Sequence, residues 1–250
     1  MPLLDSVAVV LHRPQDAVNI AAVVRVMKNM GFSDLRLVEP VAYDPWRIEG
    51  IAHGTRDLVE RIRHFDTLDL ALADCVHVSA FGAKRRAHHW PVMEPRELAP
   101  VVLERALEGR VALLFGQEDH GLPNDAIDRA QVLVRIPTTE HASLNLAQAV
   151  LVALYELHLG AGDATRRVKR HKHAAALPKQ DEWERAIGDI DRALAAIAFY
   201  KTRNGEHVIR TVRSLLNRAA PDGRELTLVR AMGIEVLRTI DRVKRGLEPK

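Results

Sequence analysis

The feature that most constrains the fold is an alternation, over the first 160 residues, of short apolar runs with segments of helical periodicity. Several runs are apolar at consecutive positions, which is typical of strands buried on both faces of a parallel sheet. The pattern predicts an α/β fold, a central parallel sheet covered by helices. The expected strands are 6–12, 35–39, 75–80, 111–116 and 132–137, and the expected helices are 20–30, 95–108 and 144–158.

The strand signals end at Gly160-Ala161-Gly162, and a basic run from Arg166 to His173 follows. Beyond it, residues 181–201, 206–219 and 225–245 carry helical periodicity and are separated by turn residues. We therefore expect an α/β domain over residues 1–160, a basic linker over 161–180 and a small helical extension over 181–250.

The charge is divided unevenly between these parts. The whole chain has a net charge of +3, but residues 1–161 hold 16 basic and 21 acidic residues, whereas residues 162–250 hold 20 and 12. The C-terminal part is therefore expected to attract polyanions such as nucleic acids. The single cysteine, Cys75, cannot form an internal disulfide, which favours a reducing, cytoplasmic setting. No membrane helix and no signal peptide are expected, because the apolar runs are far shorter than about 20 residues.

Two common phosphate-binding motifs of α/β domains are excluded. The expected turn after the first strand, residues 11–16, has no glycine, and no G-x-x-x-x-G-K-[ST] follows any strand. Gly116 and Gly121 have a similar separation, but Leu122-Pro123 stands where the lysine and hydroxyl residue would be. No metal site is expected either, because the paired histidines at 88–89 and 171–173 lack a third ligand in register.

Three other segments stand at the carboxyl ends of expected strands, where open α/β sheets bind ligands. The first runs from Asn19 through Arg25 to Gly31, and the second is the glycine-bracketed acidic loop within residues 115–122. The third covers 136–147, with Ser143 as the expected helix N-cap and Asn145 in the first turn. Taken singly, each has an ordinary explanation as a solvated charge, a turn or a capped helix.

Taken together and in this order, the segments N-x5-R-x5-G, F-G-x-E-x-x-G-L and I-P followed by S-L-N resemble the SPOUT superfamily of RNA methyltransferases, in its TrmH-like 2′-O-ribose branch. The closest likeness is to the TrmJ family of bacterial tRNA methyltransferases, which carry a helical C-terminal extension. The resemblance implies a C-terminal trefoil knot that binds S-adenosylmethionine, and a homodimer whose sites take residues from both knots. It implies no metal and no membrane partner.

Carried over residue by residue, the resemblance implies catalytic roles for Arg25, Asn19, Ser143 and Asn145. Because a guanidinium stays protonated in proteins, we expect Arg25 to pair the phosphate beside the target ribose and to stabilise developing alkoxide charge. The implied cofactor contacts are Ser79, Ala80, Gly116, Glu118, Leu122, Ile136, Ser143 and Leu144. The expected RNA contacts, besides Arg25, are Lys84, Arg85, Arg86, Arg166, Arg167, Lys169 and Arg170.

One departure from the family pattern concerns the strand that begins at Cys75. TrmJ-like proteins read Thr-Ser-Ala-Arg where this chain reads Val78-Ser79-Ala80-Phe81, so the arginine is displaced and the alignment of residues 81–86 stays open. The contact of Ser79 and Ala80 with the cofactor is still expected.

The expected activity is therefore S-adenosylmethionine-dependent 2′-O-methylation of tRNA, at nucleotide 32 in the anticodon loop. Three alternatives stay open from the residues alone: another tRNA position or a ribosomal RNA, a non-catalytic RNA-binding protein, and a generic nucleotide-binding α/β protein. Intact Asn19, Arg25, Glu118, Ser143 and Asn145 argue against a loss of catalysis.

Overall fold

The computed structural model describes residues 3–82, 91–140, 143–162, 175–202 and 204–246. By its internal contacts the chain divides into two compact units, residues 1–169 and 170–250. Each unit has its own apolar core. The expected boundaries at residues 160 and 180 stay a prediction, and most of the expected linker, residues 163–174, lies outside the described residues.

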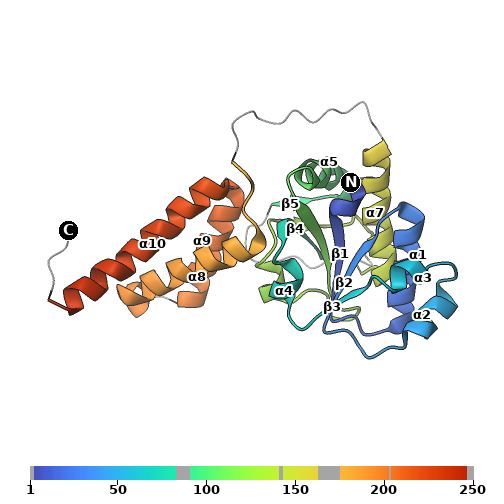
Figure 1. Cartoon of the computed structure of the whole chain (residues 1–250), viewed down its shortest axis with the longest axis horizontal. Coiled ribbons are helices and arrows are strands. Elements are labelled where there is room, and N and C mark those ends of the chain that lie inside the picture. Colours follow the sequence, from blue (N-terminus) through green and yellow to red (C-terminus); the bar gives the residue numbers. More distant parts are fainter. Residues whose placement is uncertain (1–2, 83–90, 141–142, 163–174, 203, 247–250) are drawn as a thin grey trace. The chain divides into compact units, whose positions relative to one another are not determined.

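The N-terminal unit is built on a seven-stranded sheet in which neighbouring strands are parallel (Figure 1). The strands lie in the order β3-β2-β1-β6-β4-β7-β5. This confirms the predicted α/β class, whereas the knot stays an expectation. The edge strands β3 and β5 were not predicted, because three and two residues carry no readable pattern. The bounds are β1 Val7–His12, β2 Asp34–Val38, β3 Arg63–Phe65, β4 Cys75–Phe81, β5 Val92–Met93, β6 Arg110–Phe115 and β7 Val132–Val134.

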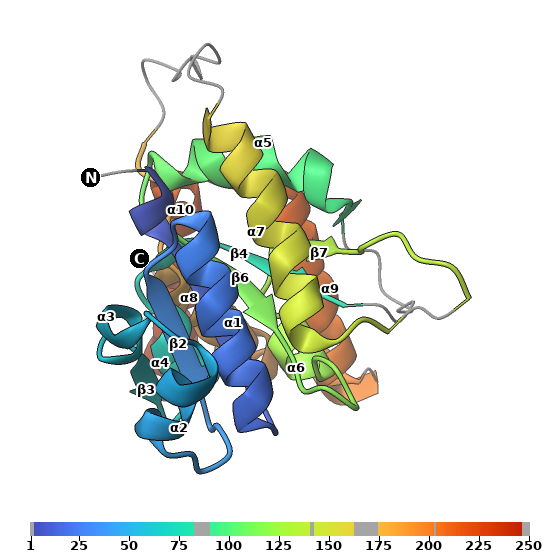
Figure 2. The ribbon, with the colours of Figure 1, turned by 90° about the vertical axis from the view of Figure 1, so that its right-hand side faces the viewer.

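Helices cover both faces of this sheet. In β1, Val7, Val9 and Leu11 pack against α1, α5 and α7, whereas Ala8 and Val10 face α4 and α6. This alternation explains why the central strands are apolar throughout. Figure 2 shows α1 and α7 side by side in front of the sheet. The bounds are η1 Leu3–Ser6, α1 Ala17–Met30, α2 Pro45–Ile51, α3 Arg56–Val59, α4 Leu68–Leu72, α5 Pro95–Ala106, α6 Asn124–Ile127 and α7 Leu146–Gly162.

The ends of α1 and α7 follow from local chemistry. The Asp16 carboxylate accepts a hydrogen bond from the Val18 N–H (2.8 Å) and caps α1, and Gly31 ends this helix in the left-handed conformation, at φ +81°. Helix α7 continues through Gly160 to Gly162, two residues into the expected linker. A Cβ on Gly160 would lie 2.9 Å from Leu103 Cδ1, so this glycine serves the close packing of α7 on α5.

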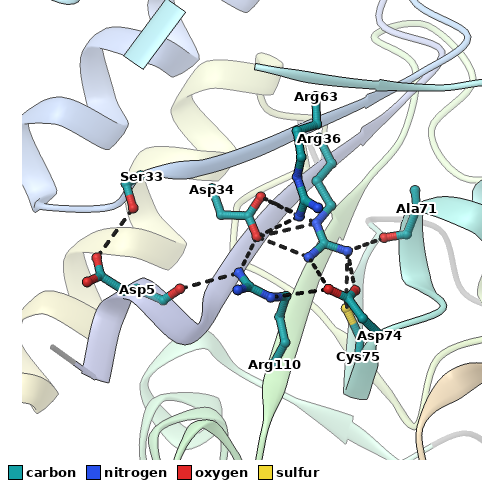
Figure 3. Close-up of polar contacts among 9 residues, drawn as sticks. All are labelled: Asp5, Ser33, Asp34, Arg36, Arg63, Ala71, Asp74, Cys75 and Arg110. Atoms are coloured by element: carbon teal, nitrogen blue, oxygen red, sulfur yellow. Dashed lines mark hydrogen bonds and ion pairs between the residues drawn. The ribbon is translucent and has the colours of Figure 1, made fainter. Parts of the chain in front are cut away.

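A buried ion network joins the amino ends of several strands (Figure 3). Arg36 is 1% exposed, and its Nη2 lies 3.0 Å from both an Asp34 and an Asp74 carboxylate oxygen. Asp34 also binds Arg63 (3.0 Å) and Arg110. The network therefore ties β2, β3 and β6 to the residue that precedes β4, at the sheet edge opposite the strands' carboxyl ends.

The network determines the ionisation of its members. Burial alone would raise the pKa of Asp34 and of Asp74, but the hydrogen bonds and charges of Arg36 and its neighbouring arginines outweigh burial and lower both pKa values. Burial raises the pKa of the Cys75 thiol to about 12, so the thiol stays protonated. These charges are mutually satisfied, and we assign the network a structural role.

The C-terminal unit is helical, as predicted. Helices α8 and α10 enclose a small core of Trp183, Ala186 and Leu226. They approach closely at Gly233, where a Cβ would lie 3.2 Å from the Asp189 carbonyl oxygen. In the part of the chain that the structure describes, no helix is long and apolar enough to cross a membrane. The bounds are α8 Gln180–Ala196, η2 Phe199–Thr202, α9 Gly205–Ala219 and α10 Gly223–Lys244.

Candidate functional site

A cavity of about 350 Å³ opens at the carboxyl ends of β4, β6 and β7. The last residues of these strands, Phe81, Phe115 and Val134, line it together with the first turn of α7. Sites for small molecules typically enclose about 300–1,000 Å³. The cavity therefore has room for a small ligand, at the sheet edge where the sequence predicts one. Of the residues expected to contact a cofactor, it gathers Gly116, Glu118, Leu122, Ile136, Ser143 and Leu144.

The loop after β6 forms one wall of the cavity with its backbone. A Cβ on Gly116 would lie 2.2 Å from the Gly121 carbonyl carbon and 2.4 Å from the Leu122 nitrogen, so only glycine fits there. Gly121 has φ +69°, and its N–H donates to the Gln117 carbonyl (2.9 Å). The loop is therefore folded back on itself, and two glycines let main-chain groups come close to the cavity.

A chain of hydrogen bonds beside the cavity joins the three segments that the sequence analysis singles out. The Glu118 carboxylate accepts from the Asn19 side-chain amide (2.9 Å) and from the Gln15 N–H (2.9 Å). The Asn19 oxygen accepts from the Asn145 amide (2.8 Å), and the Asn145 oxygen accepts from the Ala147 N–H (2.9 Å). Residues 99 and 126 positions apart in the sequence thus hold each other's orientation.

The same contacts show which of the two polar residues at the start of α7 caps the helix. Asn145 caps the helix, since its side-chain oxygen also accepts from the Gln148 N–H at 3.3 Å. The expectation that Ser143 is the N-cap and that Asn145 lies in the first turn is therefore wrong. Ser143 is exposed and lines the cavity instead of capping the helix.

Ser79 and Ala80 do not line this cavity. Both are fully buried within β4, and the Ser79 hydroxyl lies 3.1 Å from the His77 Nε2. Phe81 and Gly82, the next two residues, line the cavity in their place, and the Phe81 ring stacks on Phe115 with centroids 4.4 Å apart. The sequence analysis does not assign the two phenylalanines to the site, although their position at strand ends could have indicated them.

Arg25 is not brought to the cavity of its own chain. It lies six positions after Asn19, which places the two side chains about 120° apart around α1. The Arg25 guanidinium instead donates to the His53 carbonyl, in the loop after α2, and the side chain is exposed. The geometry thus separates Arg25 from Asn19, Ser143 and Asn145, the other residues with a predicted catalytic role.

The basic residues predicted to bind RNA lie mostly outside the described residues. This holds for Lys84, Arg85, Arg86, Arg166, Arg167, Lys169 and Arg170. In α9, Arg213 makes a bidentate ion pair with Glu184 (2.6 and 2.8 Å), and Arg210 pairs with Glu206 (3.2 Å). Arg213 is therefore engaged within the C-terminal unit. Among the described residues, no group of three or more histidine, cysteine or acidic side chains is placed to hold a metal ion.

Both parts of the chain match known proteins. Residues 6–155 match the SpoU rRNA Methylase family, and residues 181–245 match the C-terminal domain of the tRNA methyltransferase TrmJ. The tRNA (cytidine/uridine-2′-O-)-methyltransferase TrmJ of Sodalis glossinidius is 33% identical over 92% of this chain and 91% of its own length. The tRNA (cytidine/uridine/adenosine-2′-O-)-methyltransferase TrmJ of Pseudomonas aeruginosa is 34% identical, over 99% and 98%.

A solved structure gives the same result. The crystal structure of TrmJ from Z. mobilis ZM4 superposes with a TM-score of 0.78 at 31% sequence identity, over 92% of this chain and 98% of that one. At this coverage the likeness includes both units. The chain therefore belongs to the SpoU methylase family of RNA methyltransferases and, by its C-terminal domain, to the TrmJ-like members of that family.

Proposed function

We propose that this chain transfers the methyl group of S-adenosylmethionine to a ribose 2′-hydroxyl of tRNA, at nucleotide 32, and that it acts in the cytoplasm as a homodimer. The observation that carries the proposal is the hydrogen-bonded chain of Glu118, Asn19 and Asn145 beside a cavity of ligand size. These hydrogen bonds hold polar groups of all three segments together beside the cavity. The names of the relatives support tRNA as the substrate and the 2′-oxygen as the acceptor.

The cavity fits the cofactor in size and in chemistry. The loop at Gly116 and Gly121 offers main-chain donors and acceptors for the polar groups of an adenosine. Leu122, Ile136 and Leu144 provide an apolar wall against which a purine ring can pack. When bound, S-adenosylmethionine supplies a methyl group already activated by its sulfonium charge.

The protein's part in the reaction is to align the ribose hydroxyl and to accommodate its proton. The Asn145 amide has a second N–H beyond the one that Asn19 accepts, and the Ser143 hydroxyl is exposed at the same rim. We assign the orientation of the 2′-hydroxyl to these two groups. Glu118 acts through Asn19 and is in this scheme a positioning residue.

Arg25 enters the scheme from a second copy of the chain. Arg25 and Asn19 face different directions on α1, which favours a site to which one copy supplies Asn19 and the other Arg25. Next to α1, helix α7 exposes an apolar row, Leu151, Tyr155 and Leu159, which are 38%, 48% and 50% exposed. This row is the proposed contact surface between copies, and Arg25 of each copy would pair the phosphate beside the ribose held by the other.

The C-terminal unit is the proposed docking site for tRNA. Residues 162–250 carry 20 basic and 12 acidic residues, and phosphate contacts dominate RNA affinity. Arg213 is committed to Glu184, so we assign docking to the exposed cations of α9 and α10, Arg218 among them, and to the basic segment 166–173.

Incubation of the purified chain with S-adenosylmethionine and unmodified bacterial tRNA, followed by nuclease digestion and mass spectrometry, tests the proposal. The expected product is a 2′-O-methyl group at nucleotide 32. Arg25→Ala and Arg25→Lys are both expected to lose most turnover, since lysine keeps the charge but not the planar fork. Methylation elsewhere would contradict the position, and near-normal turnover of both variants would contradict the role of Arg25.

A further inference from the structure

Helix α2 presents a tryptophan to solvent. The Trp46 side chain is 77% exposed, whereas Trp183 is 4% exposed within the core of the C-terminal unit. Only 4% of the chain is aromatic, and burial of a tryptophan is among the largest apolar contributions a side chain can make. Trp46 is not part of the core of this protein, so the position of this tryptophan on the surface needs another explanation.

The exposed position of Trp46 is well defined by its neighbours. The Asp44 carboxylate caps α2 by accepting from the Trp46 N–H (2.9 Å), and Pro45 occupies the first position of the helix. Two residues later, Ile48 is fully buried and anchors α2 on the core. The backbone that carries the indole is therefore fixed, and the ring forms an exposed platform on the surface.

The surface beside the indole is open. Gly50 lies one helical turn after Trp46, on the same face of α2, and a Cβ built on it meets no atom within 4 Å. Since side chains one turn apart lie over each other on a helix, the missing side chain leaves the C-terminal side of the indole uncovered. A planar group can therefore reach the ring.

The charges beside this platform are Asp44, which caps α2, Glu49, which pairs with Arg56 (3.8 Å), and Arg47. Arg47 follows Trp46, is exposed, and makes no ion pair among the described residues. Just beyond the other end of α2, the His53 carbonyl holds the Arg25 guanidinium. A helix of seven residues is about 10 Å long, roughly the rise of three stacked nucleotides. Trp46 and Arg47 thus lie within a few nucleotides of the group that the proposed function places at the target phosphate.

We propose that Trp46 and Arg47 form a binding site for an unpaired nucleotide that flanks the methylated one, with the base stacked on the indole and a phosphate paired with Arg47. The inference rests on the proposed function, which supplies the RNA. Aromatic faces beside arginines recognise the splayed bases of single-stranded loops, whereas paired bases stay stacked within a duplex. The site therefore selects an RNA loop over a helix.

Fluorescence anisotropy of a labelled anticodon stem-loop RNA, titrated with the full chain, tests the site. Trp46→Ala is expected to raise the Kd about 5- to 100-fold, and Trp46→Phe to restore much of the affinity. Leu70→Ala is the matched control, because it removes another exposed apolar side chain, 58% exposed, from α4. The Kd for S-adenosylmethionine is expected to stay the same in all three variants.

Two further measurements make the test independent of how Trp46→Ala folds. Tryptophan emission of the unaltered chain is expected to be quenched by the stem-loop, and far less by a duplex of the same base composition. Gly50→Leu keeps the indole, favours the helix and covers the open side of the ring, so it is expected to weaken stem-loop binding as Trp46→Ala does.

Equal RNA affinity of the unaltered chain, Trp46→Ala and Gly50→Leu would overturn the inference. A change in the sedimenting mass of Trp46→Ala with unchanged RNA affinity would overturn it too, and would make this face a contact between protein chains. Failure of the proposed function has a different signature, since it is the absence of methyl transfer by the unaltered chain. Because Trp90 and Trp183 also emit, the part of the stem-loop quenching that Trp46→Phe loses decides on Trp46, whether or not methyl transfer occurs.

Discussion

Replacement of Glu118 by glutamine separates the role of the hydrogen-bonded chain from that of the cavity. The change keeps the size of the side chain and removes its charge. Both carboxylate oxygens accept a hydrogen bond, each at 2.9 Å, from Asn19 and from the Gln15 N–H. Glutamine offers one oxygen and one NH₂ group, so one of the two donors then faces another donor. We expect a loss of about 1.5–3 kcal/mol of unfolding free energy, the contribution of one hydrogen bond to a charged group.

The effect on catalysis follows from the displacement of Asn19. Without its partner, the Asn19 amide no longer fixes Asn145, and the groups that orient the ribose hydroxyl lose their alignment. Small misplacements of this kind lower rates by about 10- to 100-fold. The expected result is a fall of that size in kcat for tRNA methylation, with a Kd for S-adenosylmethionine within about twofold of the unaltered protein.

The chain provides a matched control at the next position. Asp119 is an exposed carboxylate that pairs with the exposed His120 side chain, 2.7 Å away. Asp119→Asn removes the same charge from the same loop and is expected to leave the urea midpoint unchanged. An unchanged urea midpoint and kcat for Glu118→Gln would refute the reasoning. A raised Kd for the cofactor with an unchanged kcat would instead make Glu118 a cofactor contact.

Three further predictions concern other parts of the molecule. Gly116→Ala is expected to raise the Kd for S-adenosylmethionine, measured by calorimetry, at least about 10-fold, because its Cβ would lie 2.2 Å from the Gly121 carbonyl carbon. Gly50→Ala, whose Cβ meets no neighbour, should bind S-adenosylmethionine normally. Arg36→Met leaves the carboxylates of Asp34 and Asp74 without their shared partner and should cost about 3 kcal/mol in urea unfolding at pH 7. Folding lowers the pKa values of both acids, so the stability that they contribute is complete above the ordinary value of 3.8 and is lost as the pH falls through the folded-state values. The melting temperature of Arg36→Met should therefore change less with pH in the acid range than that of the unaltered chain. A chain that ends at Gly162 is expected to bind S-adenosylmethionine normally but tRNA more weakly and with a shallower salt dependence; equal tRNA affinity and equal salt slope by anisotropy would contradict a docking role of the C-terminal unit.

The sequence predicts the layers of this fold well, because their cause is local. Consecutive apolar residues in β1 and β6 reflect strands buried on both faces, and Gly31 ends α1 as its position indicates. The short elements escape such reasoning. Two residues at β5 or four at α3 leave no periodicity, and their position depends on neighbours that the linear pattern does not name.

The sequence predicts which residues belong to the site better than it predicts the contacts between them. Strand ends and glycines indicate where Gly116, Glu118 and Asn145 lie, since parallel strands bring their carboxyl ends to one edge. Which side chain bonds which depends on rotation about α1 and on the first residue of α7. The sequence therefore placed Arg25 with Asn19, whereas helical geometry turns them apart, and it gave the cap of α7 to Ser143 instead of Asn145.

The hydrogen bonds that join Asn19, Glu118 and Asn145 have a consequence for biosynthesis. They connect residues 99 and 126 positions apart, so the set cannot be completed until Asn145, directly before α7, has emerged from the ribosome. Contacts of such long separation form late in folding, since loop closure costs entropy that only the later contacts offset. A nascent or truncated chain that lacks α7 therefore has its sheet but no site, and the first methyl transfer reports that the N-terminal unit has been completed.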